Sequence, residues 1–308
     1  MIRGIAKAAM LGAFGRTAPR FYRTLTREWL GTQATHVDKL ARVWPGYVRV
    51  WQDIGISLDG SRIWVLEGGW TLFPFLANYL TTGSGGVVTN RDGRILDRYL
   101  ARSVGGALGC DLPSSVERRR RVDSLHWKPT IPAAVAAVDG ILLENIDPGN
   151  IPLAPDSIDL CHSGGTLEHY RPEMVAAFLR EAFRILRPGA VMSHVVDHRD
   201  HLHHADTSWP FLAHLSLPDP IYNVAFGHPL LYHNRLLPGE IEELFRSAGF
   251  ESITVRKMVL PDRRYVEDAM EGAPGIERSR LARRFRSATD ADLRTAAAHY
   301  LFRKPRGI

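Results

Sequence analysis

The chain has 308 residues, of which 45% are hydrophobic and 23% charged, and its formal net charge is +6. This balance is ordinary for a globular protein, and it excludes a disordered tail protein, a collagen-like repeat and a polytopic membrane protein. The only two cysteines, Cys110 and Cys161, exclude a disulfide framework and a zinc ribbon. We therefore expect a reducing, cytoplasmic location.

The first 27 residues form a basic segment. It carries six basic residues and no acidic one, and a short apolar patch lies at residues 8–14. Three interpretations fit this composition: a basic amphipathic surface helix, a transit-like leader or an unstructured arm. Residues 1–27 therefore allow weak contact with a membrane surface, and a peripheral position at the inner membrane face is an alternative location. The other basic residues are spread along the chain, so we expect no nucleic-acid partner.

A helix and a short strand are expected next. Helical patterning runs from about residue 20 to residue 44, and Pro45 is expected to end it. We take residues 1–58 as an N-terminal basic arm and helical segment. The apolar, β-prone run at residues 62–66 then predicts a buried strand that ends in a glycine turn.

Strands and helices alternate along the middle of the chain. This alternation favours a parallel sheet built from right-handed crossover units. We therefore predict an α/β, Rossmann-like fold over residues 59–308, with a mostly parallel sheet flanked by helices. Further strands are predicted at residues 87–89, 140–143, 158–163 and 190–196, and helices at residues 74–80 and 172–186.

Residues 197–235 interrupt the alternation. This stretch is rich in aromatic residues, histidine and proline, and it is too apolar for a linker. We interpret it as a lid insertion over the sheet edge. A helix at residues 237–248 and a strand at residues 252–259 are predicted to follow.

Polar side chains follow four of the predicted strands. Glu67, Asn90, Asp147 and Ser163 each come at or just after a strand end. In an open parallel sheet, ligands bind outside the carboxyl ends of the strands. Four such residues along one edge indicate a site for a nucleoside-type cofactor.

A family resemblance rests on three motifs in the second half of the sheet. The string Ile-Pro-Leu-Ala-Pro-Asp-Ser-Ile-Asp-Leu at residues 151–160 is followed by Leu167-Glu168-His169 and by Leu186-Arg187-Pro188-Gly189. With these motifs, residues 63–196 resemble a class I S-adenosylmethionine-dependent methyltransferase of the type 11 branch. The run at residues 197–201 also resembles relatives of this branch. The resemblance implies the class I methyltransferase fold and S-adenosylmethionine as the cofactor.

The resemblance assigns the loop after the first strand to the methionine moiety of the cofactor. Glu67, Gly68, Gly69 and Trp70 occupy this loop. The family pattern is acid-x-Gly-x-Gly-x-Gly, so this loop is either shortened or carries other residues in place of two glycines. The departure supports an alternative function, a catalytically inactive methyltransferase-fold protein that serves as a binding or scaffold subunit.

Other strand ends are assigned by the same resemblance. Asn90 or Asp92 falls where the family binds the ribose, and Ser163 would line the floor below the sulfonium. Ile146 and Asp147 fall at the adenine position, where Asp147 resembles the acid that contacts the adenine amino group.

The expected reaction is methyl transfer from S-adenosylmethionine to an oxygen or nitrogen of a small-molecule or glycan acceptor. A general base is needed only for a hydroxyl or a protonated amine. His201 or His194, beside Asp197 or Asp200, is the candidate base. Two other interpretations stay open for this histidine-rich stretch, a polar lid with structural histidines and a divalent-ion site, and we assign no metal ligands. The oligomeric state is not determined.

Overall fold

The computed structural model describes residues 32–67, 71–90, 97, 100–110, 121, 129–201, 203, 211–227, 232–258 and 277–307. The predicted basic arm, Gly68, Gly69, Trp70 and Asp92 lie outside these residues. The chain divides into two compact units. We call residues 30–163, 180–193 and 303–308 the N-terminal unit, and the described parts of 164–179 and 194–302 the C-terminal unit.

Seven strands form a sheet with the order β3-β2-β1-β4-β5-β7-β6. The pairings of β3 with β2, of β2 with β1 and of β1 with β4 are parallel. The first five positions follow the doubly wound Rossmann order 3-2-1-4-5, so the predicted fold class is confirmed. The strands are β1 (Ile63–Val65), β2 (Val87–Asn90), β3 (Ile141–Glu144), β4 (Ile158–Gly164), β5 (Leu186–Asp197), β6 (Glu251–Met258) and β7 (Ala297–Arg303).

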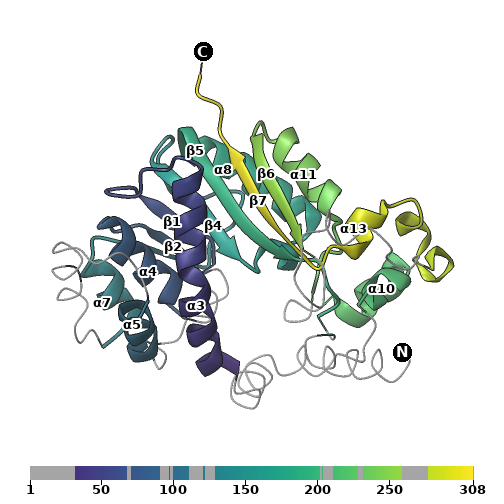
Figure 1. The fold of residues 1–308 in the computed structure, drawn as a ribbon, viewed down its shortest axis with the longest axis horizontal. Coiled ribbons are helices and arrows are strands. Elements are labelled where there is room, and N and C mark those ends of the chain that lie inside the picture. The colour runs from purple at the N-terminus through teal and green to yellow at the C-terminus, as the bar shows by residue number, and fades with distance from the viewer. Residues whose placement is uncertain are drawn as a thin grey trace. The chain divides into compact units, whose positions relative to one another are not determined.

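Three helices of the N-terminal unit pack on one another. They are α3 (Thr32–Asp53), α4 (Phe73–Thr82) and α5 (Leu100–Leu108), and α4 also packs on β1 (Figure 1). The short α7 (Ile131–Ala136) leads into β3. No helix in the described part of the chain is long and apolar enough to cross a membrane.

The expected end of the first helix at Pro45 is wrong. Helix α3 continues through Pro45 to Asp53. Proline lacks the N–H that would bond the carbonyl four residues earlier, and that carbonyl, on Ala41, instead accepts from the Cys110 thiol at 3.5 Å. Trp44, before the proline, and Trp51, after it, are both buried. Their burial stabilises one continuous helix and outweighs the local penalty.

The core of the N-terminal unit surrounds a buried histidine. Trp44 and Trp51 contact His162 of β4 with ring centroids 5.4 and 5.2 Å away. Asn78 on α4 lies 3.0 Å from the His162 imidazole, Nδ2 to Nε2. These contacts fix β4 in the core just before its last two residues, Ser163 and Gly164.

The C-terminal unit contains β6, β7 and several short helices. Helix α11 packs on β6, and Phe245 of α11 stacks on Phe302 of β7 with ring centroids 4.4 Å apart. Helix α8 (Pro172–Ile185) contributes residues to both units. The other helical segments of the C-terminal unit in the described part of the chain are η2 (Leu167–His169), η3 (Ala213–Ser216), α10 (Asp219–Phe226), α11 (Pro238–Ser247), η4 (Arg278–Arg280), η5 (Arg283–Phe285) and α13 (Asp290–Arg294).

The last part of the chain holds a strand that sequence analysis missed. Residues 298–302 of β7 are all buried. The strand therefore lacks the alternation of apolar and polar residues by which a half-exposed strand is recognised in a sequence. The predicted lid contains η3 and α10 in its described part. The boundary at residue 58 and the function of residues 197–235 as a lid stay predictions.

Candidate functional site

The ends of β1 and β3 carry two residues with a left-handed backbone. Glu67 has φ +53° and Asn145 has φ +52°. Residues other than glycine adopt this conformation rarely, and such positions concentrate at functional sites. Because the strands run β3-β2-β1-β4 in parallel, their carboxyl ends meet at one edge of the sheet. We call the residues at the ends of β1, β2 and β3 the strand-end edge.

Two hydrogen bonds join neighbouring strands at this edge. The backbone N–H of Glu67 donates to Thr89 Oγ1 at 2.8 Å. The side chain of Asn90, which is buried, donates from Nδ2 to Oε1 of Glu144 at 2.9 Å. Glu144 was not among the predicted site residues. It is the last residue of β3, so its position at a strand end could have identified it from the sequence. The bond to Asn90 holds the Glu144 carboxylate at the end of β2.

The remaining predicted cofactor residues lie at or after other strand ends of the same unit. Asp147 is exposed in the turn after β3, and its Oδ1 accepts from Gly149 N at 2.9 Å. Ile146 is half-buried, and Ser163 is buried near the end of β4. The structure therefore brings Glu67, Asn90 and Asp147 to the ends of three adjacent strands.

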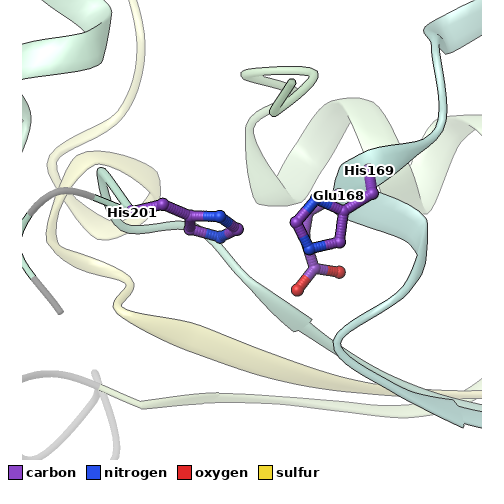
Figure 2. A group of neighbouring side chains, drawn as sticks. All are labelled: Glu168, His169 and His201. Carbon is purple, nitrogen blue, oxygen red and sulfur yellow. The ribbon is translucent and has the colours of Figure 1, made fainter. Parts of the chain in front are cut away.

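A second group of polar side chains lies within the C-terminal unit. Glu168, His169 and His201 each offer one ligand atom, and the three atoms lie within 4.8 Å of one another. Figure 2 shows the His201 ring pointing toward His169 and the Glu168 carboxylate. We call these three residues the Glu-His-His cluster. Glu168 and His169 belong to η2, and His201 follows β5.

Glu168 is a buried carboxyl group. Its side-chain Oε1 lies 3.3 Å from the backbone N–H of Asp197, which donates to it. Its Oε2 atom is buried and has no hydrogen-bond partner among the described residues. Burial raises the pKa of Glu168 to about 8, and the negative charge of Asp197 adds to the effect.

The two histidines of the cluster have defined neighbours. The Nδ1 atom of His169 lies 3.0 Å from the backbone oxygen of Tyr232. A carbonyl oxygen only accepts, so Nδ1 carries the proton and the lone pair of the neutral ring is on Nε2. His201 lies between two other imidazoles, with ring centroids 4.9 Å from His169 and 4.6 Å from His233.

The structure places the three residues proposed as catalytic from sequence in different surroundings. Asp197 forms a bidentate ion pair with Arg199, with distances of 2.9 and 2.6 Å from its carboxylate oxygens. His194 is fully buried on β5, and its ring packs against Phe178 and Phe245 at 5.8 and 6.0 Å. Only His201 lies in the Glu-His-His cluster.

A segment at residues 232–236 supports the cluster from outside. Asn234 of this segment is buried, and its side-chain Nδ2 donates to the backbone oxygens of Leu167 and Tyr170 at 2.8 and 3.0 Å. The backbone N–H of Asn234 also donates to the backbone oxygen of Glu168 at 2.7 Å. Nε2 of His233 lies 2.9 Å from the backbone oxygen of Asp197. The turn that holds Glu168 and His169 is therefore fixed by a segment more than 60 residues further along the chain.

The resemblance recognised in the sequence is confirmed by a family model. Residues 99–193 match the model described as a methyltransferase domain. The strand order and this match support a Rossmann-like, class I methyltransferase domain. Comparison with curated protein sequences finds no match.

Several solved methyltransferase structures are similar to this chain. One is an S-adenosylmethionine-dependent methyltransferase from Mesorhizobium loti, with 13% identity, a TM-score of 0.46, and 87% of this chain and 99% of that chain covered. Another, from Methanosarcina mazei, has 12% identity and a TM-score of 0.44 over 82% and 95% of the two chains. Phosphoethanolamine N-methyltransferase 2 from Haemonchus contortus, in complex with S-adenosyl-L-methionine, has 13% identity and a TM-score of 0.48 over 92% and 59%.

Proposed function

We propose that this protein is an S-adenosylmethionine-dependent methyltransferase that acts on an oxygen or nitrogen of a small molecule or glycan. The observation that carries the proposal is the match of residues 99–193 to the methyltransferase domain. The strand-end edge supports it, because polar groups follow three adjacent parallel strands where ligands of open α/β sheets bind.

The residues present at the strand-end edge fit the cofactor. S-adenosylmethionine carries a sulfonium cation and an adenosine group, so carboxylates and backbone carbonyls suit it. Glu67 would hold the cationic methionine moiety, and its left-handed backbone supports a specialised position. Asp147 would accept from the adenine amino group. When bound, the cofactor supplies an electrophilic methyl group.

The ribose position is completed by a pair of side chains. Asn90 is uncharged, whereas an acid after the second strand commonly accepts from ribose hydroxyls. The Asn90 side chain binds the Glu144 carboxylate at 2.9 Å. We propose that Glu144 supplies the missing acid for the ribose, in place of or together with Asp92.

The role of the protein in methyl transfer is mainly one of positioning. Alignment of nucleophile and methyl group supplies an effective molarity on the order of 10⁵–10⁸ M. A hydroxyl or protonated-amine acceptor also needs a base. Of the three candidates, His201 with no metal ion on its ring is supported best, because His194 is fully buried and Asp197 is paired with Arg199.

Cofactor binding is tested by calorimetric titration of the full chain with S-adenosylhomocysteine. We expect micromolar binding by the unmodified protein and about 10-fold or greater weakening by Asp147→Ala. The matched control is Asp139→Asn, which removes an exposed carboxylate just before the opposite end of β3. Absence of binding at millimolar ligand, in protein with a cooperative unfolding transition, would favour the inactive scaffold instead.

A further inference from the structure

The Glu-His-His cluster has the composition of a metal site. We propose that Glu168, His169 and His201 bind a divalent transition-metal ion of the Zn²⁺ type. The proposal goes beyond methyl transfer and does not depend on it. Two imidazole nitrogens and one carboxylate oxygen are a common ligand set for zinc and related ions.

The spacing of the three ligand atoms fits one ion after a small adjustment. The atoms lie within 4.8 Å of one another. Ligands bound at about 2.1 Å to a tetrahedral ion lie roughly 3.4 Å apart. The cluster therefore has to contract by about 1.4 Å at most, which is within the range of side-chain rotation (Figure 2).

Glu168 gives an independent reason for a cation. Its side chain is 2% exposed, and its Oε2 atom has no hydrogen-bond partner among the described residues. Leaving a buried polar group unsatisfied is costly, and such an atom requires an explanation. A cation between this oxygen and the two imidazoles would satisfy it.

Outer contacts orient the ligands as they do in known metal sites. Metal-binding histidines commonly donate their other ring N–H to a carbonyl or carboxylate. His169 does so from Nδ1 to the backbone oxygen of Tyr232, so Nε2 is the nitrogen that would bind the ion. Asp197 donates its backbone N–H to Oε1 of Glu168 at 3.3 Å. Two of the three ligands thus have an outer contact that sets their orientation.

The chemistry of the proposed site follows from its charge and ligand count. Two neutral histidines and one carboxylate leave a net charge of about +1 after a divalent ion binds. Three protein ligands leave at least one coordination position for water or for an oxygen of a substrate. The site would therefore favour oxygen ligands and lower the pKa of a bound water or hydroxyl.

The test uses the full chain after treatment with a chelator, with Zn²⁺ alone as the probe. We expect one equivalent to bind in calorimetry, and Co²⁺ in its place to give visible absorption bands of a low-symmetry site. The Glu168→Gln and His201→Ala variants should bind Zn²⁺ about 100-fold more weakly or not at all. His203→Ala is the matched control, because His203 lies on the same segment and outside the cluster, and it should bind normally.

Thermal unfolding separates loss of the site from loss of the fold. Zn²⁺ should raise the melting temperature of the unmodified protein and of His203→Ala, because a ligand that binds only the folded state stabilises it. The Glu168→Gln variant should unfold cooperatively and show no rise. Lack of Zn²⁺ binding by the unmodified protein, or equal binding by Glu168→Gln and His203→Ala, would overturn the proposal whatever the outcome with S-adenosylhomocysteine.

Discussion

The strand-end edge and the Glu-His-His cluster are built in different ways. At the edge, Glu67, Asn90 and Glu144 stand at the ends of neighbouring parallel strands, and their positions follow from the strands themselves. The turn after β4 that holds Glu168 and His169 is bonded to residues that come 29 to 67 positions later in the chain. The pairing of regular strands therefore sets the first region, and hydrogen bonds between irregular segments set the second.

Acidification should destabilise the C-terminal unit, and this is the largest effect we expect. Burial lowers the pKa of His198 and of His299 to about 4, so both are neutral in the folded protein. The unfolded chain takes up these protons near pH 6.5. The contribution of these two histidines is thus complete above about pH 6.5 and falls as the pH drops toward 4, by up to about 3 kcal/mol for each histidine. Glu168, whose pKa is raised to about 8, contributes in the opposite direction over this range.

Urea unfolding between pH 7.5 and 4.5 measures this dependence. The His299→Gln variant should lose less stability on acidification than the unmodified protein, because it removes one of the buried histidines whose pKa is lowered. The half-buried His203 provides the control. If the free energy of unfolding depends on pH equally in His299→Gln and in the unmodified protein, burial of His299 does not contribute to the acid sensitivity.

Removal of Arg235 should have the next largest effect. The Arg235 guanidinium is buried and donates to the backbone oxygens of His214 and Leu217 at 3.1 and 2.7 Å. It also forms an ion pair with Asp219 and lies 3.8 Å from the centre of the Tyr222 ring. We expect Arg235→Met to lower the free energy of unfolding by about 3 kcal/mol. Denaturant titration measures the change.

An exposed ion pair provides the comparison for Arg235. Arg246 pairs with Glu242 at 2.8 Å across one turn of α11, and its side chain is half exposed. Pairs of this kind contribute about 0.3–0.5 kcal/mol. Arg246→Met should therefore change the free energy of unfolding by less than about 0.5 kcal/mol, and equal effects of the two substitutions would contradict the importance of burial.

Replacement of Asn234 should affect both the stability of the protein and Zn²⁺ binding by the Glu-His-His cluster. The Asn234 side chain bonds the backbone oxygens of Leu167 and Tyr170, on either side of Glu168 and His169. We expect Asn234→Ala to lower the free energy of unfolding by about 2 kcal/mol, because two buried carbonyl groups lose their donor. It should also weaken Zn²⁺ binding about 10-fold. Binding of S-adenosylhomocysteine at the strand-end edge should change little, and a large loss there would contradict the separation of the two regions.

Apart from the Arg246 comparison, the smallest expected effect is at the strand-end edge. The Glu144→Gln variant removes the negative charge held by Asn90. We expect S-adenosylhomocysteine to bind about 10-fold more weakly, equivalent to about 1.4 kcal/mol, with an unchanged melting temperature. Calorimetry checks the affinity against Asp139→Asn, which lies before the other end of the strand. Unchanged affinity in Glu144→Gln would assign the ribose contact to other groups.

Sequence alone predicted the fold class and six of the seven strands, β1 to β6. Runs such as residues 62–66 and 158–163 are apolar and end at turn residues, so local chemistry specifies them. The polar residues at their ends could be placed for the same reason. The loop at Gly68, Gly69 and Trp70 lies outside the described residues, so its part in cofactor binding stays a prediction.

Tertiary structure decided the features that depend on distant partners. Pro45 stays within α3 for two reasons. The Cys110 thiol donates to the Ala41 carbonyl, which has no backbone donor because of the proline, and the tryptophans on both sides of Pro45 are buried. His194 and His201, which are alike in sequence, end up in an aromatic core and in the Glu-His-His cluster. Burial and hydrogen bonding are properties of the folded chain, so periodicity could not distinguish these residues, whereas the strands that carry the edge follow directly from the local pattern.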